Sequence, residues 1–120
     1  MPIRRTKYAL RLAALALTVS GLAEASGSGS GTVTNFTPTE TGGVEFFVVT
    51  LASMTGMASC ATTARFALSA SDPKYRTTVA ILLAAYYSGA SVFARGLGTC
   101  NTYAGSEDLA YVCADNGLPC

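Results

Sequence analysis

Four cysteines constrain the fold of this chain more than any other feature, because a small domain with two disulfides has few ways to arrange its loops. They are Cys60, Cys100, Cys113 and Cys120. An even number in a short chain favours disulfides, whereas a zinc site is disfavoured because the chain has no CxxC spacing and no histidine. Three pairings are possible. We favour Cys60–Cys100 with Cys113–Cys120, because the second pair closes a short Asn-Gly-Leu-Pro turn.

The N-terminus predicts an oxidising compartment. Residues 4–7 carry three basic side chains, residues 8–19 are mostly apolar, and residues 23–25 read Ala-Glu-Ala, which is the order of a signal peptide and its cleavage site. The apolar run is shorter than the roughly 20 residues of a membrane-spanning helix. We therefore predict a signal peptide over residues 1–25, a secreted or periplasmic protein, and no membrane span after cleavage. A buried N-terminal helix is the alternative.

The charge balance argues against a nucleic-acid binder, and the absence of histidine argues against an enzyme. Residues 1–25 contain four of the eight basic and one of the seven acidic residues, so the remaining domain has six acids and four bases. A nucleic-acid binder would show a basic stripe, and none is present. Without histidine the common catalytic triads cannot be built, so we expect neither an enzyme nor a cofactor nor a metal.

Three acidic residues need an explanation. Glu107 and Asp108 are adjacent and would point to opposite faces of an extended chain, so we interpret them as the solvated end of a loop. Glu45 stands within an apolar segment, where we expect it to pair with Arg65 or Arg95.

The pattern of apolar and turn residues predicts five strands and one helix. Residues 26–31 alternate serine and glycine and are interpreted as a flexible leader. Strands are predicted over residues 32–37 (ended by Pro38), 44–51, 61–68, 91–97 and 109–114. The segment 44–51 is apolar on both faces and therefore requires cover on both.

A helix is predicted over residues 73–88, with Pro73 in its first turn. Its apolar stripe, predicted to face the core, consists of Tyr75, Val79, Leu82, Leu83 and Tyr86. The opposite face carries no charge and is predicted to form an oligomer interface through Thr77, Ile81, Ala84 and Ser88.

The order β-β-β-α-β-β over residues 32–120 is that of the OB-fold, a five-stranded Greek-key barrel. An α+β sandwich of the same elements is the structural rival. Because OB-folds bind oligosaccharides through strand faces and loops, we select aromatic and polar residues near the last two strands as ligand candidates: Phe93, Arg95, Tyr103 and Tyr111.

Residues 60–113 carry a family resemblance. The segment from Cys60 to Ser69, the helix end Leu82-Leu83-Ala84-Ala85-Tyr86-Tyr87-Ser88-Gly89 and the following Ala90-Ser91-Val92-Phe93 resemble the B subunits of pertussis-like AB toxins, such as those of subtilase cytotoxin and typhoid toxin. The resemblance implies an OB-fold, a homo-pentameric ring, binding of sialylated host glycans and transport of a toxic A subunit. Two departures stand out: a single cysteine before the helix, and Ala94-Arg95-Gly96 where the family has an aromatic of the sugar site. The alternative function is a monomeric exported OB-fold protein that binds or inhibits another protein.

Overall fold

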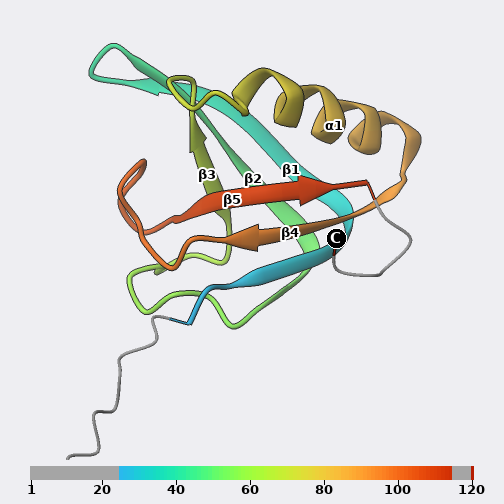
Figure 1. Ribbon diagram of the computed structural model, residues 1–120, viewed down its shortest axis with the longest axis horizontal. Helices are drawn as coiled ribbons and strands as arrows, with labels where there is room; N and C mark the ends of the chain where they lie inside the picture. The colour runs from blue at the N-terminus through green and yellow to red at the C-terminus, as the bar shows by residue number, and fades with distance from the viewer. Residues whose placement is uncertain (1–24, 115–119) are drawn as a thin grey trace, which may run out of the picture.

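The computed structural model describes residues 25–114 and Cys120. The predicted signal peptide, up to residue 24, and the turn between Cys113 and Cys120 lie outside the described residues. The elements are β1 (Ser28–Thr41), β2 (Val44–Thr55), β3 (Phe66–Ser69), α1 (Tyr75–Ser88), β4 (Ser91–Gly96) and β5 (Glu107–Cys113), shown in Figure 1. The predicted order β-β-β-α-β-β is therefore confirmed, and the domain is mainly β with one helix.

The five strands form one sheet in the order β1-β2-β3-β5-β4, and β4 pairs with β1 so that the ring closes. All neighbours are antiparallel except β3 and β5, which run parallel. Closure depends on a bend in β1, whose first residues pair with both β2 and β4. The register shifts between Ser30 and Val33, and Gly31 between them has a φ of 98°, which glycine adopts without steric cost.

Two predictions for β1 are wrong. The Ser/Gly leader over residues 26–31 is ordered, because Ser28 already lies in β1 and Gly27 and Gly29 are buried. The strand also continues through Pro38, which pairs with Phe47 of β2. Among the described residues, only the first part of β1, up to Thr32, pairs with β4, so at Pro38 one edge of β1 has no partner strand. The N–H that proline lacks would face this open edge, so no ladder hydrogen bond is lost.

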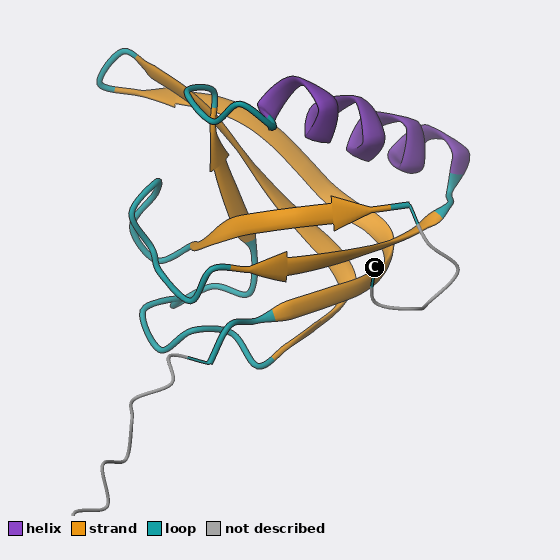
Figure 2. Cartoon of the chain, in the orientation of Figure 1, coloured by secondary structure: helices purple, strands orange, loops and turns teal. Residues whose placement is uncertain are grey.

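The core lies inside the ring and under α1. The inner face of β2 contributes Phe47, Val49 and Leu51, which pack with Phe66 of β3 and Leu82 of α1. The other elements of the ring complete this cluster with Val33, Leu68, Ala85, Val92, Ala94 and Leu109. Figure 2 shows the helix lying outside the strands at one end of the ring, so most of its surface faces solvent.

The helix is rotated relative to the predicted stripe. Its buried residues are Thr78, Leu82 and Ala85, whereas Leu83 and Tyr86 are exposed. Ile81, which was placed on the outer face, is half-buried and packs against the core. Its predicted companions Thr77, Ala84 and Ser88 are exposed. Small and apolar residues occur all round this helix, so the sequence pattern did not fix which face is inward.

The favoured disulfide pairing is present. Cys60 is joined to Cys100, with 40 residues of separation, and Cys113 to Cys120, with 7. The first bond links the segment after β2 to the segment after β4, so it ties two distant loops together. Both bonds are consistent with a protein that matures in an oxidising compartment.

Within the described part of the chain, no helix has the length and apolar character needed to cross a membrane.

Candidate functional site

The site is organised by the segment between β4 and β5, residues 97–106, called here the 97–106 loop. It folds back over the outer face of β2 and β3 and carries Tyr103. Cys100 anchors it to Cys60, and the N–H of Thr63 donates to the carbonyl of Gly105 at 3.1 Å. The loop is therefore held by a covalent bond and by backbone contacts to the segment before β3.

Asp108 fixes the first half of this loop. Its carboxylate accepts hydrogen bonds from the Thr99 hydroxyl at 2.7 Å and from the N–H groups of Asn101 and Thr102 at 2.8 Å each. Burial by itself raises the pKa of Asp108, but these hydrogen bonds favour the charged form and outweigh it, so the pKa lies below its ordinary value. An ionised Asp108 is thus part of the loop's structure.

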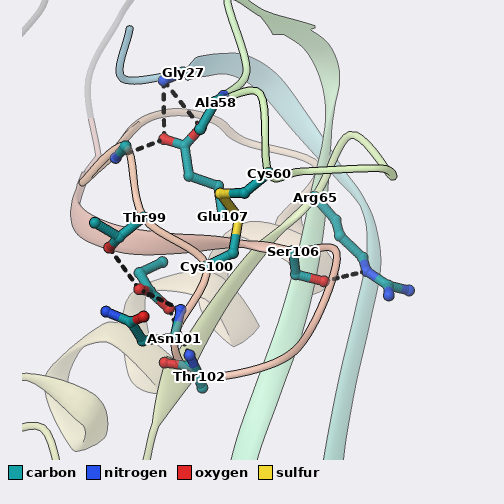
Figure 3. The surroundings of a disulfide bond; sticks show 12 residues. Gly27, Ala58, Cys60, Arg65, Thr99, Cys100, Asn101, Thr102, Ser106 and Glu107 are labelled. Carbon is teal, nitrogen blue, oxygen red and sulfur yellow. Dashed lines mark hydrogen bonds between the residues drawn. A yellow bond between two sulfur atoms is a disulfide. The ribbon is translucent and has the colours of Figure 1, made fainter. Parts of the chain in front are cut away.

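The Glu107 side chain points to the opposite face of β5 from Asp108 and accepts hydrogen bonds from three backbone segments. Its carboxylate accepts from the N–H of Gly27 at 2.8 Å, of Ala58 at 2.6 Å and of Gly98 at 3.4 Å. Figure 3 shows Glu107 reaching Gly27 and Ala58 beside the Cys60–Cys100 disulfide. The predicted opposite orientation of the two acids is thus correct. Their interpretation as a solvated loop end is wrong, because both side chains are buried and bonded to main-chain N–H groups.

Tyr103 is the aromatic centre of the site. Its ring stacks on Phe46 of β2 with centroids 5.0 Å apart, and the guanidinium of Arg65 lies 5.1 Å from the Tyr103 centroid. The Nε–H of Arg65 donates to the Ser106 hydroxyl, which orients the guanidinium. Phe46 is the outward-facing aromatic of the doubly apolar strand, so the 97–106 loop supplies the cover that this strand requires.

A polar groove of about 420 Å³ lies beside this cluster. Its walls are the outer faces of β1 and β2 together with Arg65 and Tyr103. Most of the lining side chains carry a hydroxyl or an amide: Asn35, Thr37, Thr39, Thr50, Thr63 and Tyr103, with Val48 as the aliphatic member. We call this the Arg65–Tyr103 groove, and its volume falls in the range of small-ligand sites.

A second hollow of about 500 Å³ is also lined by Tyr103. It is more apolar and is bounded by the end of β1, the first part of β2, the end of β3 and the 97–106 loop: Thr41, Val44, Phe46, Ser69, Asn101, Thr102, Tyr103 and Ala104. Tyr103 is therefore the residue that the two depressions share.

The four predicted ligand residues fall into two groups. Tyr103 lies in the groove, whereas Phe93, Arg95 and Tyr111 lie on β4 and β5. There the Phe93 and Tyr111 rings are 6.4 Å apart and Arg95 is the strand partner of Tyr111. Sequence reasoning did not select Arg65 as a ligand residue. The alternation of Asn35, Thr37 and Thr39 along β1 is the signal that would have indicated a polar outer face.

The ion pair predicted for Glu45 is not found. Glu45 accepts a hydrogen bond from the Tyr75 hydroxyl at 3.2 Å, and among the described residues the only ion pair joins Lys74 and Asp72. Burial, followed by the neighbouring Glu45, raises the pKa of Tyr75. Arg65 is thus without a carboxylate partner in the described part of the chain.

An aromatic patch lies apart from the groove, on α1 and the adjoining part of β1. Leu83, Tyr86 and Tyr87 are exposed, Tyr87 by 82%, and Phe36 and Pro38 border the same depression. The rings of Tyr86 and Tyr87 pack edge to face with centroids 5.3 Å apart. This patch, like the groove, holds no group of metal-ligating side chains among the residues described.

Comparisons of the chain with protein-family models, curated proteins and solved structures gave no match.

Proposed function

We propose that this chain is an exported glycan-binding domain, built as an OB-fold and similar in role to the B subunits of pertussis-like AB toxins, with its sugar site in the Arg65–Tyr103 groove. The observation that carries the proposal is a positioned guanidinium without an acidic partner, set against an aromatic ring in a groove lined by hydroxyl groups.

The fold supports this proposal through strand order. A closed ring β1-β2-β3-β5-β4 with one helix between the third and fourth strands is compatible with a small OB barrel, which is part of the proposal. OB-folds bind oligosaccharides on strand faces and the loops beside them, and the groove lies on the β1–β2 face beside the 97–106 loop.

The chemistry of the groove matches a sugar that carries a carboxylate, such as a sialylated glycan. Ser106 uses one of the five N–H donors of Arg65, so the remaining donors are available for a bidentate contact with a carboxylate. The Thr37, Thr39 and Thr50 hydroxyls both donate and accept, as sugar hydroxyls do. The exposed part of the Tyr103 ring offers an apolar surface for the sugar ring.

Export, a ring of five copies and an associated A subunit belong to the same proposal. They rest on the order of the N-terminal segment and on the resemblance over residues 60–113. Two disulfides and a net negative domain with no basic stripe are consistent with a role outside the cytosol and away from nucleic acid.

A second candidate function is binding of another protein, which the aromatic patch favours. Exposed tyrosines are enriched where proteins associate, and Tyr87 is the most exposed large apolar side chain among the described residues. In this reading the chain is a monomeric exported OB-fold protein that binds or inhibits its partner through α1.

The proposal is tested by a glycan array with the oxidised protein, followed by titration of the strongest ligand against two arginine variants. Arg65→Gln removes the charge from the groove and should weaken binding by about 10- to 100-fold, the range for a lost hydrogen bond to a charged group. Arg95→Gln is the matched control, because it removes the same charge from β4 and should leave the affinity unchanged.

Each result has a defined meaning. Loss of binding with Arg95→Gln and not with Arg65→Gln moves the site to the Phe93–Tyr111 face. Absence of any glycan ligand for the oxidised protein counts against the first function and in favour of the second.

A further inference from the structure

Glu107 is a buried carboxylate whose charge has no partner in the described part of the chain. It is 0% exposed, and neither a lysine nor an arginine of these residues forms an ion pair with it. Three main-chain N–H groups satisfy its hydrogen bonding but do not neutralise its charge. Burial of an ionised carboxylate is costly unless an opposite charge accompanies it.

Ser26, the residue after the predicted cleavage site, directly precedes a residue whose N–H donates to this carboxylate. The nitrogen of Gly27 is 2.8 Å from one Glu107 oxygen and 3.2 Å from the other. The nitrogen of Ser26 lies one peptide unit before the nitrogen of Gly27, and consecutive Cα atoms are about 3.8 Å apart. Ser26 is half-buried, whereas Ala25 is exposed. A chain that begins at Ser26 therefore carries its terminal amine one peptide unit from a nitrogen that donates to the Glu107 carboxylate.

The surroundings of Glu107 leave room for a bare backbone and not for side chains. A Cβ at Gly27 would lie 2.9 Å from a Glu107 oxygen and 2.7 Å from the Met57 sulfur. A Cβ at Gly96 would lie 1.6 Å from the other oxygen. Main-chain atoms of Gly27 and Gly96 therefore approach the carboxylate closely, and a side chain at either position would collide with it.

We infer that Glu107 is the binding site for the α-ammonium group created by cleavage between Ala25 and Ser26. In this hydrolysis water supplies a hydroxyl to the Ala25 carbonyl and a hydrogen to the Ser26 nitrogen, which takes up a further proton at neutral pH. The new cation then compensates the buried Glu107. The inference rests on the proposed export, because only a processed chain carries this amine.

The pair would stabilise the parts of the molecule that build the groove. Glu107 also holds Ala58, two residues before Cys60, and Gly98, two residues before Cys100. An ion pair would offset the desolvation cost of the buried carboxylate that accepts these hydrogen bonds. Processing therefore completes the anchoring of the 97–106 loop that positions Tyr103.

The test compares three oxidised proteins that differ only at the first residues: one that begins at Ser26, one that begins at Ala25, and one that begins at N-acetylated Ser26. The chain that begins at Ala25 is the matched control, since it keeps the charge and moves it one residue away. We expect a melting temperature lower by about 5 °C for the extended and the acetylated chains than for the Ser26 chain. Glu107→Gln should abolish these differences, because the carboxylate is then absent.

Amide hydrogen exchange at Ala58 and Gly98 in the three unmutated chains gives a second measurement that does not depend on folding of Glu107→Gln. Faster exchange in the acetylated and extended chains supports the pair. Equal stability and equal exchange in all three chains overturn it and leave the proposed export intact. An exported protein whose intact mass begins elsewhere than Ser26 overturns both the cleavage site and the inference.

Discussion

Two adjacent acidic residues decide much of the architecture at the residue scale. Glu107 and Asp108 are the first residues of β5, and neighbouring side chains of a strand point to opposite faces. Glu107 therefore accepts hydrogen bonds from Gly27 and Ala58, whereas Asp108 accepts them from the 97–106 loop. The alternation was predictable from the sequence. Their burial was not, because five of the six donors that these carboxylates accept from are main-chain N–H groups, which no residue type reveals; the sixth is the Thr99 hydroxyl.

Asp108→Asn should lower the free energy of unfolding by about 1.5–3 kcal/mol at neutral pH, since the amide cannot accept all the hydrogen bonds that the carboxylate accepts. The folded pKa of Asp108 lies below its ordinary value of 3.8. Its contribution is therefore fully present above about pH 3.8 and is lost as the pH falls through the folded pKa. Urea unfolding of both proteins between neutral pH and about pH 2 should show the difference between them shrinking at the acidic end. A difference that stays constant over that range contradicts this role.

Gly96→Ala should destabilise the fold by about 3 kcal/mol, the upper end of the range for an overpacked site, because its Cβ would overlap a Glu107 oxygen and lie 2.8 Å from the Phe66 ring. Thermal unfolding measures the loss. In the double variant Gly96→Ala with Glu107→Asp, the shorter acid withdraws from the added methyl group. The two losses should therefore be less than additive, and strict additivity would exclude the contact as the cause.

At the scale of elements, the sequence predicted the kinds and order of the segments well and their faces poorly. The strand at residues 44–51 is the core of β2, and the helix predicted over residues 73–88 corresponds to α1. Periodicity failed for the helix because Ile81, Leu83 and Tyr86 are all apolar, so only packing against β1 and β5 selects the inward face. The sequence predicted Tyr103 as a ligand residue, whereas its neighbours across the groove come from strands far away in the chain.

The disulfide of the 97–106 loop should contribute more than the C-terminal one. Cys60 and Cys100 are separated by 40 residues. Replacement of both by alanine should lower the free energy of unfolding by about 4 kcal/mol, according to the loop-entropy relation. We also expect weaker glycan binding, because Tyr103 loses its anchor. Replacement of Cys113 and Cys120 is the matched control. These two cysteines are separated by only 7 residues and lie away from the groove. Their replacement should lower the free energy of unfolding by less and leave glycan binding unchanged. Denaturant unfolding and glycan titration measure the two effects, and equal losses from the two pairs contradict the assignment.

At the scale of the whole molecule, the outer surface of α1 is the main candidate for self-association. Thr77, Ala84 and Ser88 are exposed and small, and Tyr86 and Tyr87 add apolar area beside them. A cyclic oligomer would bury this surface in repeated contacts between neighbouring copies.

Ala84→Arg should dissociate the proposed ring of five without lowering the stability of the isolated subunit, since Ala84 is exposed. The melting temperature should fall only by the contribution of assembly. Ile81→Lys is expected to lower the stability of each subunit as well, because Ile81 packs against the core. Sedimentation of the oxidised protein and of both variants separates these effects. A monomeric unmutated protein at tens of micromolar removes the ring from the proposal and leaves the aromatic patch to a different partner.

Ring closure through β1 also sets the order in which the molecule can be assembled in time. β1 pairs with β4, and Gly27 bonds Glu107 across 80 residues, so a chain that emerges N-terminus first has no partners for these groups until almost all of it is present. Such distant pairings make folding slow. During this interval the first residues of β1 can pair with β2, but their β4 edge stays open. This stretch is rich in serine, glycine and threonine and poor in the apolar character that drives aggregation. The polar start of β1 therefore limits aggregation while β4 has not yet paired with it.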